Sequence, residues 1–203
     1  MQRRAYGPTA WLIDNVTHPG AYAQAVTAVA IDGVLEVLPA EATVLVVCER
    51  DRLEAIGTAL DQIEPNLGER PRGADQREVV IEVVYDGEDL ADVSEQAGVG
   101  VAEVIDRHQK GVYTVEFCGF SPGFAYLSGL DPILRLPRRS IPRIHVLAGS
   151  VAIAAHYSAI YPSRSPGGWH LLGTTTAEIW NTERSNPALL TPGTTVRFER
   201  KEG

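Results

Sequence analysis

The sequence is poor in cysteine, and the spacing that cysteine-based sites need is missing. The 203 residues include two cysteines, Cys48 and Cys118, with no C-x-x-C pair. A disulfide framework or a zinc knuckle is therefore not expected. Each cysteine ends an apolar, strand-like run, so we expect both thiols to be buried.

Long apolar runs are missing as well. No run reaches the ~18 residues that suggest a membrane span. The opening "MQRRAYGPTAW" has two arginines but no apolar signal core. We therefore expect a cytoplasmic protein without a membrane partner. The net charge of −8 also argues against wholesale nucleic-acid binding.

The common catalytic templates are absent too. The chain has no G-x-x-x-x-G-K-[ST] loop, no G-x-G-x-x-G after a strand, no H-E-x-x-H and no G-x-S-x-G. Ser165 has no base placed beside it by the sequence, and the histidines lack metal-ligand spacing. The sequence thus identifies no catalytic residue and no metal site, and it does not describe a self-contained enzyme of a common class.

What is present predicts a globular α+β protein. Hydrophobic content is 44% and charged content 22%, as in ordinary globular proteins. Strands at 10–13, 34–39 and 43–48, with helices at 18–32 and ending near 63, predict a small two-layer α/β domain. A segment rich in Pro, Gly and charge at 65–76 predicts a linker. We therefore expect domains at 1–75 and 76–203.

The second domain is predicted to be a β-barrel. A strand at 78–85 and helices at 89–98 and 100–110 precede a strand at 112–118. Short apolar pieces separated by prolines and glycines then follow, which is typical of a closed or nearly closed barrel. His108 shares a helix face with Val104 and Ile105, so we expect it to be partly buried rather than a ligand.

The charge is distributed unevenly within this domain. Residues 75–106 carry ten acids and one base, whereas residues 117–173 carry one acid and five arginines. The two windows form either solvated faces of opposite sign or a local anion site in an acidic protein. The glycines and aromatic residues of the second window favour the anion site.

Three clusters in that window are candidate site residues. The stretch "FCGFSPGFAYL" is either a tight corner packed by aromatic rings or the aromatic wall of a pocket. In "LPRRSIPR", prolines hold arginines that can bind a carboxylate or phosphate, although arginine runs are usually solvated. In "IYPSRSPGGWHLLG", glycines can present backbone N–H groups in a concave turn. The candidates are Phe120, Phe124, Tyr126, Arg138, Arg139, Arg143, Tyr161, Ser165, Gly167, Gly168 and Trp169.

Together these blocks carry a resemblance to a known family. F-x-P-G-F-x-Y-L, P-R-R-x-x-P-R, A-G-S-V and S-P-G-G-W occur in this order. The chain resembles the family of allophanate hydrolase subunit 1, also called the B-type subunit of 5-oxoprolinase, over most of its length. The resemblance implies a small α/β domain followed by a cyclophilin-like β-barrel domain.

The resemblance also implies an activity and partners. The family's members act in ATP-dependent amide hydrolysis, either of 5-oxoproline to glutamate or of a urea-derived amide such as allophanate. ATP is used by the complex. The implied partners are a homologous second subunit, similar to allophanate hydrolase subunit 2 (the C-type subunit of 5-oxoprolinase), and a separate hydrolase subunit. Relatives of both homologous subunits also form part of urea carboxylase.

Two other functions remain open. One member of the family inhibits a histidine kinase, so a regulatory interaction protein is the alternative. Prolyl isomerisation is suggested only by analogy of fold.

The sequence also departs from the family's usual pattern. Leu147 stands where a proline is usual, Ala155 and Ala159 where glycines are usual, and Thr174 where an arginine is usual. These changes leave the substrate open.

Overall fold

The computed structural model describes residues 1–63 and 77–201. The chain divides into two compact units, Met1–Ala74 and Asp75–Gly203. The predicted linker at 65–76 and the boundary predicted within it lie outside the described residues. Each unit is described by itself below.

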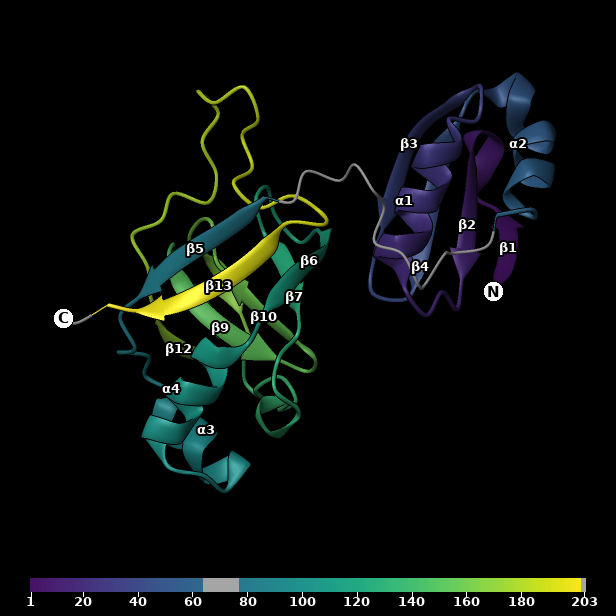
Figure 1. The fold of residues 1–203 in the computed structure, drawn as a ribbon. Coiled ribbons are helices and arrows are strands. Elements are labelled where there is room, and N and C mark those ends of the chain that lie inside the picture. Colours follow the sequence, from purple (N-terminus) through teal and green to yellow (C-terminus); the bar gives the residue numbers. More distant parts are fainter. Residues whose placement is uncertain (64–76, 202–203) are drawn as a thin grey trace. The chain divides into compact units, whose positions relative to one another are not determined.

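The first unit is a four-stranded antiparallel sheet with two helices (Figure 1). The strands follow the order β1-β2-β4-β3, so the apolar strand β4 is central, as its sequence predicts. The elements are β1 (Gln2–Ala5), β2 (Ala10–Asp14), α1 (Pro19–Val29), β3 (Val34–Pro39), β4 (Thr43–Cys48) and α2 (Leu53–Leu60).

One face of this sheet packs against the helices to form the core of the unit. Val44, Val46 and Cys48 alternate along β4 toward that core, which also contains Trp11 and Ile56. Alternate residues of a strand point to the same face, so a single strand supplies three of these contacts. This two-layer arrangement agrees with the predicted fold class.

The strand β1 is an element that the sequence did not predict. It reads "QRRA", and its side chains are largely exposed. It pairs with β2 in antiparallel register, from Gln2 opposite Asp14 to Ala5 opposite Trp11. An edge strand with polar side chains carries no apolar periodicity, so the pairing comes from the neighbouring strand and not from a local signal.

The second unit is built around a seven-stranded sheet in the order β12-β9-β10-β7-β6-β13-β5, with β8 and β11 forming a separate pair. Its elements are β5 (Glu78–Val83), α3 (Leu90–Ala97), α4 (Val101–Lys110), β6 (Tyr113–Cys118), β7 (Ala125–Ser128), β8 (Arg143–Val146), β9 (Ser150–Ala154), β10 (Tyr157–Ile160), β11 (Ser165–Gly167), β12 (His170–Thr174) and β13 (Thr195–Arg200).

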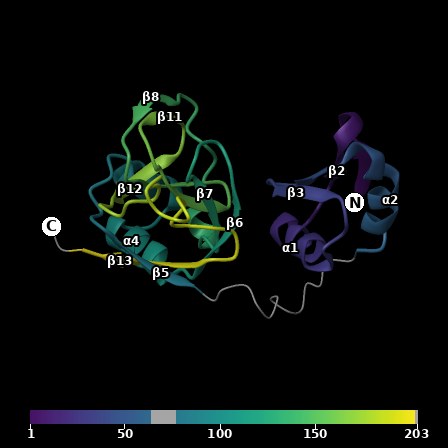
Figure 2. The same ribbon diagram turned by 90° about the horizontal axis from the view of Figure 1, so that it is seen from above.

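The two edges of this sheet meet and nearly close it into a barrel (Figure 2). Val84, just after β5, pairs with Thr174 at the end of β12, and each backbone N–H donates to the other residue's carbonyl, at 2.9 and 2.8 Å. A further hydrogen bond joins the same two edges, from the Gly87 N–H to the Leu172 carbonyl. The predicted fold class, a mixed α and β protein with a nearly closed β-barrel, is confirmed.

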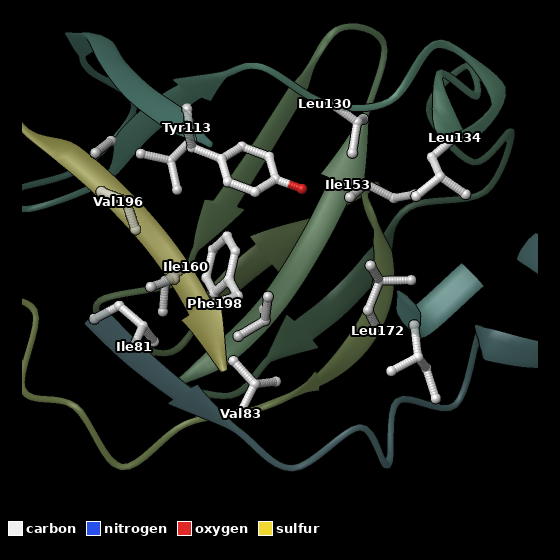
Figure 3. Close-up of a cluster of buried hydrophobic side chains, with 14 of the residues drawn as sticks. Ile81, Val83, Tyr113, Leu130, Leu134, Ile153, Ile160, Leu172, Val196 and Phe198 are labelled. Carbon is white, nitrogen blue, oxygen red and sulfur yellow. The ribbon is translucent and has the colours of Figure 1, made fainter. Parts of the chain in front are cut away.

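Apolar side chains from all around the barrel meet in its interior (Figure 3). Ile153 and Ile160 from β9 and β10, Leu172 from β12 and Phe198 from β13 are each 2% exposed or less. The α4 helix packs against β13 and the α3 helix against β12, so both helices are anchored to the sheet. The core therefore fixes where β12 and α3 lie, and these elements carry the site described below.

His108 is more deeply buried than its sequence predicts. It has no exposed surface, its Nδ1 lies 2.8 Å from the Tyr85 hydroxyl and its Nε2 lies 2.9 Å from the Ser158 hydroxyl. Its ring stacks on Phe198 with the ring centres 4.5 Å apart. Burial lowers the pKa of His108 to about 3, so the ring is neutral at neutral pH. It is a satisfied core histidine.

The two cysteines have different environments. Cys48 is buried as predicted, but Cys118 is exposed, so the prediction of burial was wrong there. Along β6 the core-facing positions are Tyr113, Val115 and Phe117. Because side chains alternate along a strand, the next residue, Cys118, points away from that face.

No helix within the described residues is long and apolar enough to cross a membrane.

Candidate functional site

The arginine segment, residues 137–143, lies beside the glycine-rich turn, as the sequence predicts. Arg143 begins β8 and pairs with Gly167 of β11, and the Arg139 N–H donates to the Gly168 carbonyl at 2.8 Å. These backbone contacts join segments that are about 25 residues apart in the chain. Two of the three predicted clusters therefore form one structural unit, which Figure 2 shows as the paired strands β8 and β11.

Asp89, directly before α3, binds two of the arginines, Arg139 and Arg143. The residue is buried, with 1% of its surface exposed. Its Oδ1 accepts hydrogen bonds from Arg139 Nη1 at 2.5 Å and Arg143 Nη2 at 2.8 Å, and its Oδ2 accepts one from the Leu171 N–H at 2.7 Å. A buried carboxylate needs such partners to offset the loss of its hydration. Asp89 thereby ties the arginine segment to β12.

The sequence did not single out Asp89. It is one of ten acids in residues 75–106, and it has no spacing that distinguishes it from its neighbours. The arginines that it pairs with follow about 50 residues later. The contrast between the acidic and basic windows was the available signal, but it could not say which acid is buried.

Exposed acids complete the pairing of these two arginines. Arg143 Nε lies 2.7 Å from Glu88 Oε1, and Arg139 Nη1 lies 3.5 Å from Asp92 Oδ2. Burial acts to lower the pKa of Arg143, but hydrogen bonds and charges from Asp89 and Glu88 outweigh burial and raise it. The charges of Arg139 and Arg143 are therefore already neutralised by acids of the same unit.

Arg138 is in a different situation. Its side chain is exposed, and within residues 1–63 and 77–201 it has no hydrogen-bond or ion-pair partner. Two further donors nearby are unpaired in the same ranges, Arg139 Nε and Arg143 Nη1, both closed to water. Of the three predicted anion-binding arginines, Arg138 is the one whose full charge is available to a ligand.

A pocket of about 370 Å³ opens beside Arg138. It is lined by residues 137–141, by Gln96 of α3 and by His170 at the start of β12. The volume is at the small end of the roughly 300–1,000 Å³ typical of ligand pockets. Five of its seven lining residues carry polar or charged side chains, whereas Pro137 and Ile141 are apolar, and this mixed wall can hold a small ligand that carries polar groups.

His170, which lines this pocket, is another residue that the sequence did not identify as a candidate. It is 3% exposed, and its Nε2 lies 2.9 Å from the Pro137 carbonyl oxygen. A carbonyl oxygen only accepts, so Nε2 carries the hydrogen, and in this tautomer Nδ1 holds the lone pair. Among the described residues, Nδ1 has no partner. The ring is fixed, with one nitrogen left unpaired.

The predicted aromatic residues form a packed cluster next to this site. Phe124, Tyr161 and Trp169 are nearly or fully buried, and the centre of the Phe124 ring lies 5.3 and 5.6 Å from those of Tyr161 and Trp169. Tyr126, half-buried, lies against Phe124 and Trp169. These rings do not line the pocket beside Arg138. Their packing matches the tight-corner interpretation of this stretch.

Phe120 differs from the other aromatic residues. It is 60% exposed and has a φ of +70°, a conformation that is costly for a bulky residue. Its ring meets Phe124 edge-on. A strained and exposed aromatic residue indicates a contact surface more than a core position.

Tyr161 links the aromatic rings to the arginines. Burial raises the pKa of its hydroxyl, while the Trp169 backbone amide and the charges of Arg138 and Arg143 act in the opposite direction. A Cβ added to Gly167 would come within 2.2 Å of the Tyr161 oxygen, so only glycine fits there. Gly167 thus serves close packing, and Gly168 supplies the carbonyl that holds Arg139.

Ser165 has no catalytic partner within the described residues. Its Oγ is buried and has no hydrogen-bond partner in that part of the chain. The same residues contain no group of three or more His, Cys, Asp or Glu that could hold a metal ion.

The positions at which the sequence departs from the family pattern have distinct environments. Leu147 is 66% exposed, and Thr174 donates to Asp86 at 3.1 Å. Ala155 has a φ of +50°, a conformation that glycine adopts without cost. The usual glycine at that position is therefore explained by the backbone.

Comparisons with known proteins agree with this picture. Residues 8–190 match the family model described as "Carboxyltransferase domain, subdomain C and D". The chain is 43% identical to the B-type subunit of 5-oxoprolinase from Escherichia coli O157:H7 over 133 residues, which are 64% of this chain and 61% of that protein. The chain thus spans about three fifths of the length of this curated relative.

Solved structures show the same fold. The structure of TTHA0988 matches 100% of this chain and 41% of its own, with a TM-score of 0.80 and 33% identity. The Kluyveromyces lactis urea carboxylase structure matches 98% of this chain and 22% of its own, with a TM-score of 0.68 and 17% identity. The second likeness concerns the fold alone.

Proposed function

Because the chain belongs to the carboxyltransferase subdomain C and D family, which includes the B-type subunit of 5-oxoprolinase, we propose that it is one component of a 5-oxoprolinase-type complex. In this complex it helps to hydrolyse the amide bond of 5-oxoproline, giving glutamate, at the expense of ATP. A urea-derived amide such as allophanate is the other substrate of this class. The complex acts in the cytoplasm.

The observation that carries this proposal is the pocket beside Arg138. Its volume of about 370 Å³ suits a small acid, and Arg138 offers one available positive charge. The blocks that resemble the family, "LPRRSIPR" and "SPGGW", are the segments that build its walls and their support. The residues tied to the family are therefore the residues that shape the site.

A partner subunit is part of the proposal. Among the described residues Ser165 has no hydrogen-bonded base, so it does not form a nucleophile–base pair there. We assign catalysis to a complex with a homologous second subunit, similar to allophanate hydrolase subunit 2, and with a separate hydrolase subunit.

The pocket does not fit ATP. A triphosphate carries several negative charges, whereas Arg139 and Arg143 are already neutralised by Asp89, Glu88 and Asp92. One available arginine and a small volume suit a single carboxylate better. ATP is accordingly assigned to the complex and not to this pocket.

The alternative function is a regulatory interaction protein that inhibits a histidine kinase. It is favoured by exposed apolar side chains on and beside β8, where Ile141, Ile144 and Leu147 are 77%, 78% and 66% exposed. Exposed apolar residues of this kind mark contact surfaces. The same surface serves a partner subunit equally well.

Co-expression with the adjacently encoded homologous second subunit tests the proposal. ADP and glutamate are measured with and without 5-oxoproline, for the chain alone and for the co-purified complex with the hydrolase subunit added. The chain alone should be inert, and the complete mixture should form both products only with 5-oxoproline. Turnover by the single chain, or an inactive complete mixture, would reject the proposal. Inhibition of a kinase by the single chain would support the alternative.

A further inference from the structure

Two different recognition groups, the Arg138 guanidinium and the His170 ring, line the pocket. We propose that it binds a small carboxylic acid that also carries an N–H, with Arg138 pairing with the carboxylate and His170 Nδ1 accepting the N–H hydrogen. This inference rests on the proposed function for its probe, 5-oxoproline, which carries both groups. It assigns substrate recognition to named atoms of this chain.

Arg138 is the anion-binding group because its neighbours are already engaged. Asp89 accepts from both Arg139 and Arg143, and it is itself buried. These two arginines therefore hold the wall in place, while Arg138 remains exposed on the same proline-flanked segment. A guanidinium on a stiff segment binds a carboxylate with little loss of freedom.

His170 is the acceptor because its other nitrogen is committed. The Nε2–H donates to the Pro137 carbonyl, and both residues line the pocket. The Nδ1 lone pair is buried and has no partner in the described part of the chain. Buried acceptors are almost always paired in folded proteins, so an unpaired one beside a pocket indicates a group that a ligand satisfies.

Together, Arg138 and His170 recognise more than the charge of a ligand. A plain carboxylate satisfies Arg138 but leaves Nδ1 unpaired. A neutral lactam satisfies Nδ1 but leaves Arg138 without an anion. Only a ligand with both groups pairs with both, so the pocket should discriminate at each end of the molecule.

Three ligands test this on the full chain by calorimetry. They are 5-oxoproline, its lactone analogue in which oxygen replaces N–H, and 2-pyrrolidinone, which lacks the carboxylate. An acceptor left unpaired weakens binding by about 5- to 150-fold, so the lactone should bind that much more weakly than 5-oxoproline. Equal binding of 5-oxoproline and the lactone, or no binding of 5-oxoproline, would overturn the proposal.

Variants assign each preference to its residue. Arg138→Ala should weaken 5-oxoproline and the lactone alike, by about 10- to 150-fold, and leave 2-pyrrolidinone unchanged. Arg138→Lys should restore part of the loss, because lysine keeps the charge but not the planar fork. Arg200→Ala removes an exposed arginine outside the pocket and should bind all three ligands as the wild type does. If Arg138→Ala binds 5-oxoproline as tightly as Arg200→Ala, the carboxylate assignment is wrong.

His170→Phe should abolish the preference for 5-oxoproline over the lactone while keeping the effect of Arg138→Ala. If this variant does not fold, the comparison of 5-oxoproline with its lactone on the wild-type chain still tests the proposed acceptor.

Failure of the inference is distinguishable from failure of the proposed function. A complex that hydrolyses 5-oxoproline normally when built with Arg138→Ala, at subsaturating substrate, keeps the function and rejects the inference. An inactive wild-type complex rejects the function.

Discussion

The two units keep their polar groups in different places. In the first unit the described ion pairs, such as Arg4 with Asp14 and Arg52 with Asp32, lie at the surface. All the buried polar side chains of the described residues lie in the second unit: Asp89, His108, Ser150, Ser158, His170 and Thr194. Burying such groups is costly unless they are paired. The first unit is thus held by apolar packing, whereas the second accepts this cost, in part to fix its arginine segment.

The two units should differ most in how much stability they lose when one paired carboxylate is removed from each. Asp89→Ala leaves Arg139 and Arg143 facing each other without their shared partner, and it should lower the free energy of unfolding by about 3–5 kcal/mol. The matched change in the first unit, Asp14→Ala, removes a surface partner and should cost at most about 1 kcal/mol. Urea denaturation of the full chain measures both. Equal losses for the two variants would show that Asp89 has no special structural role.

The buried histidine makes the second unit sensitive to acid. The pKa of His108 in the folded state is about 3, below its ordinary value near 6.5, because burial disfavours the charged ring. The unfolded chain therefore binds the proton first, and stability is lost as the pH falls from about 6.5 toward 3. The loss reaches about 1.4 kcal/mol per pH unit from this residue alone.

His108→Leu sharpens this prediction. The variant should be less stable at neutral pH, because Tyr85 and Ser158 lose their partner. Its free energy of unfolding should also fall less steeply with decreasing pH, because the contribution of His108 is gone. Urea denaturation between pH 7 and pH 4 gives the two slopes. Parallel slopes for the wild type and His108→Leu would contradict a neutral buried ring.

The smallest effect concerns one alanine in each unit. Ala30 directly follows α1 and Ala155 lies in the turn between β9 and β10, both with a φ of +50°. This conformation is mildly strained for alanine, so Ala30→Gly and Ala155→Gly should each raise the free energy of unfolding by up to about 1 kcal/mol. Thermal unfolding measures the change. A clear loss of stability in either variant would mean that the methyl group makes contacts that outweigh the strain.

The sequence predicted the regular parts of the fold because their signals are local. The apolar runs of β4 and β9, the helix that starts at Pro19 and the turn-rich barrel strands all follow from the periodicity and composition of short stretches. The edge strand β1 has no such signal, and Cys118 was expected to be buried from its apolar neighbourhood although its place in the alternation pointed outward.

The site was predicted only in outline, for a physical reason. The sequence showed that the arginines and the glycine-rich turn could converge, and backbone pairing brings them together. It could not show that Asp89 neutralises two of the arginines, because that contact spans about 50 residues and leaves no periodic trace. His170 was overlooked for a similar reason. Its role depends on which nitrogen the Pro137 carbonyl engages, and only the folded structure fixes that.

The central claim is that this chain is the substrate-recognising component of a 5-oxoprolinase-type complex. Its most direct test is the rate of glutamate formation from subsaturating 5-oxoproline by the complete complex, built in parallel with wild-type chain, Arg138→Ala and Arg200→Ala. The account predicts ATP-dependent glutamate formation with the wild type and with Arg200→Ala, and a rate about 10- to 150-fold lower with Arg138→Ala, although all three complexes assemble. Complexes that assemble fully but form no glutamate with the wild-type chain would contradict it.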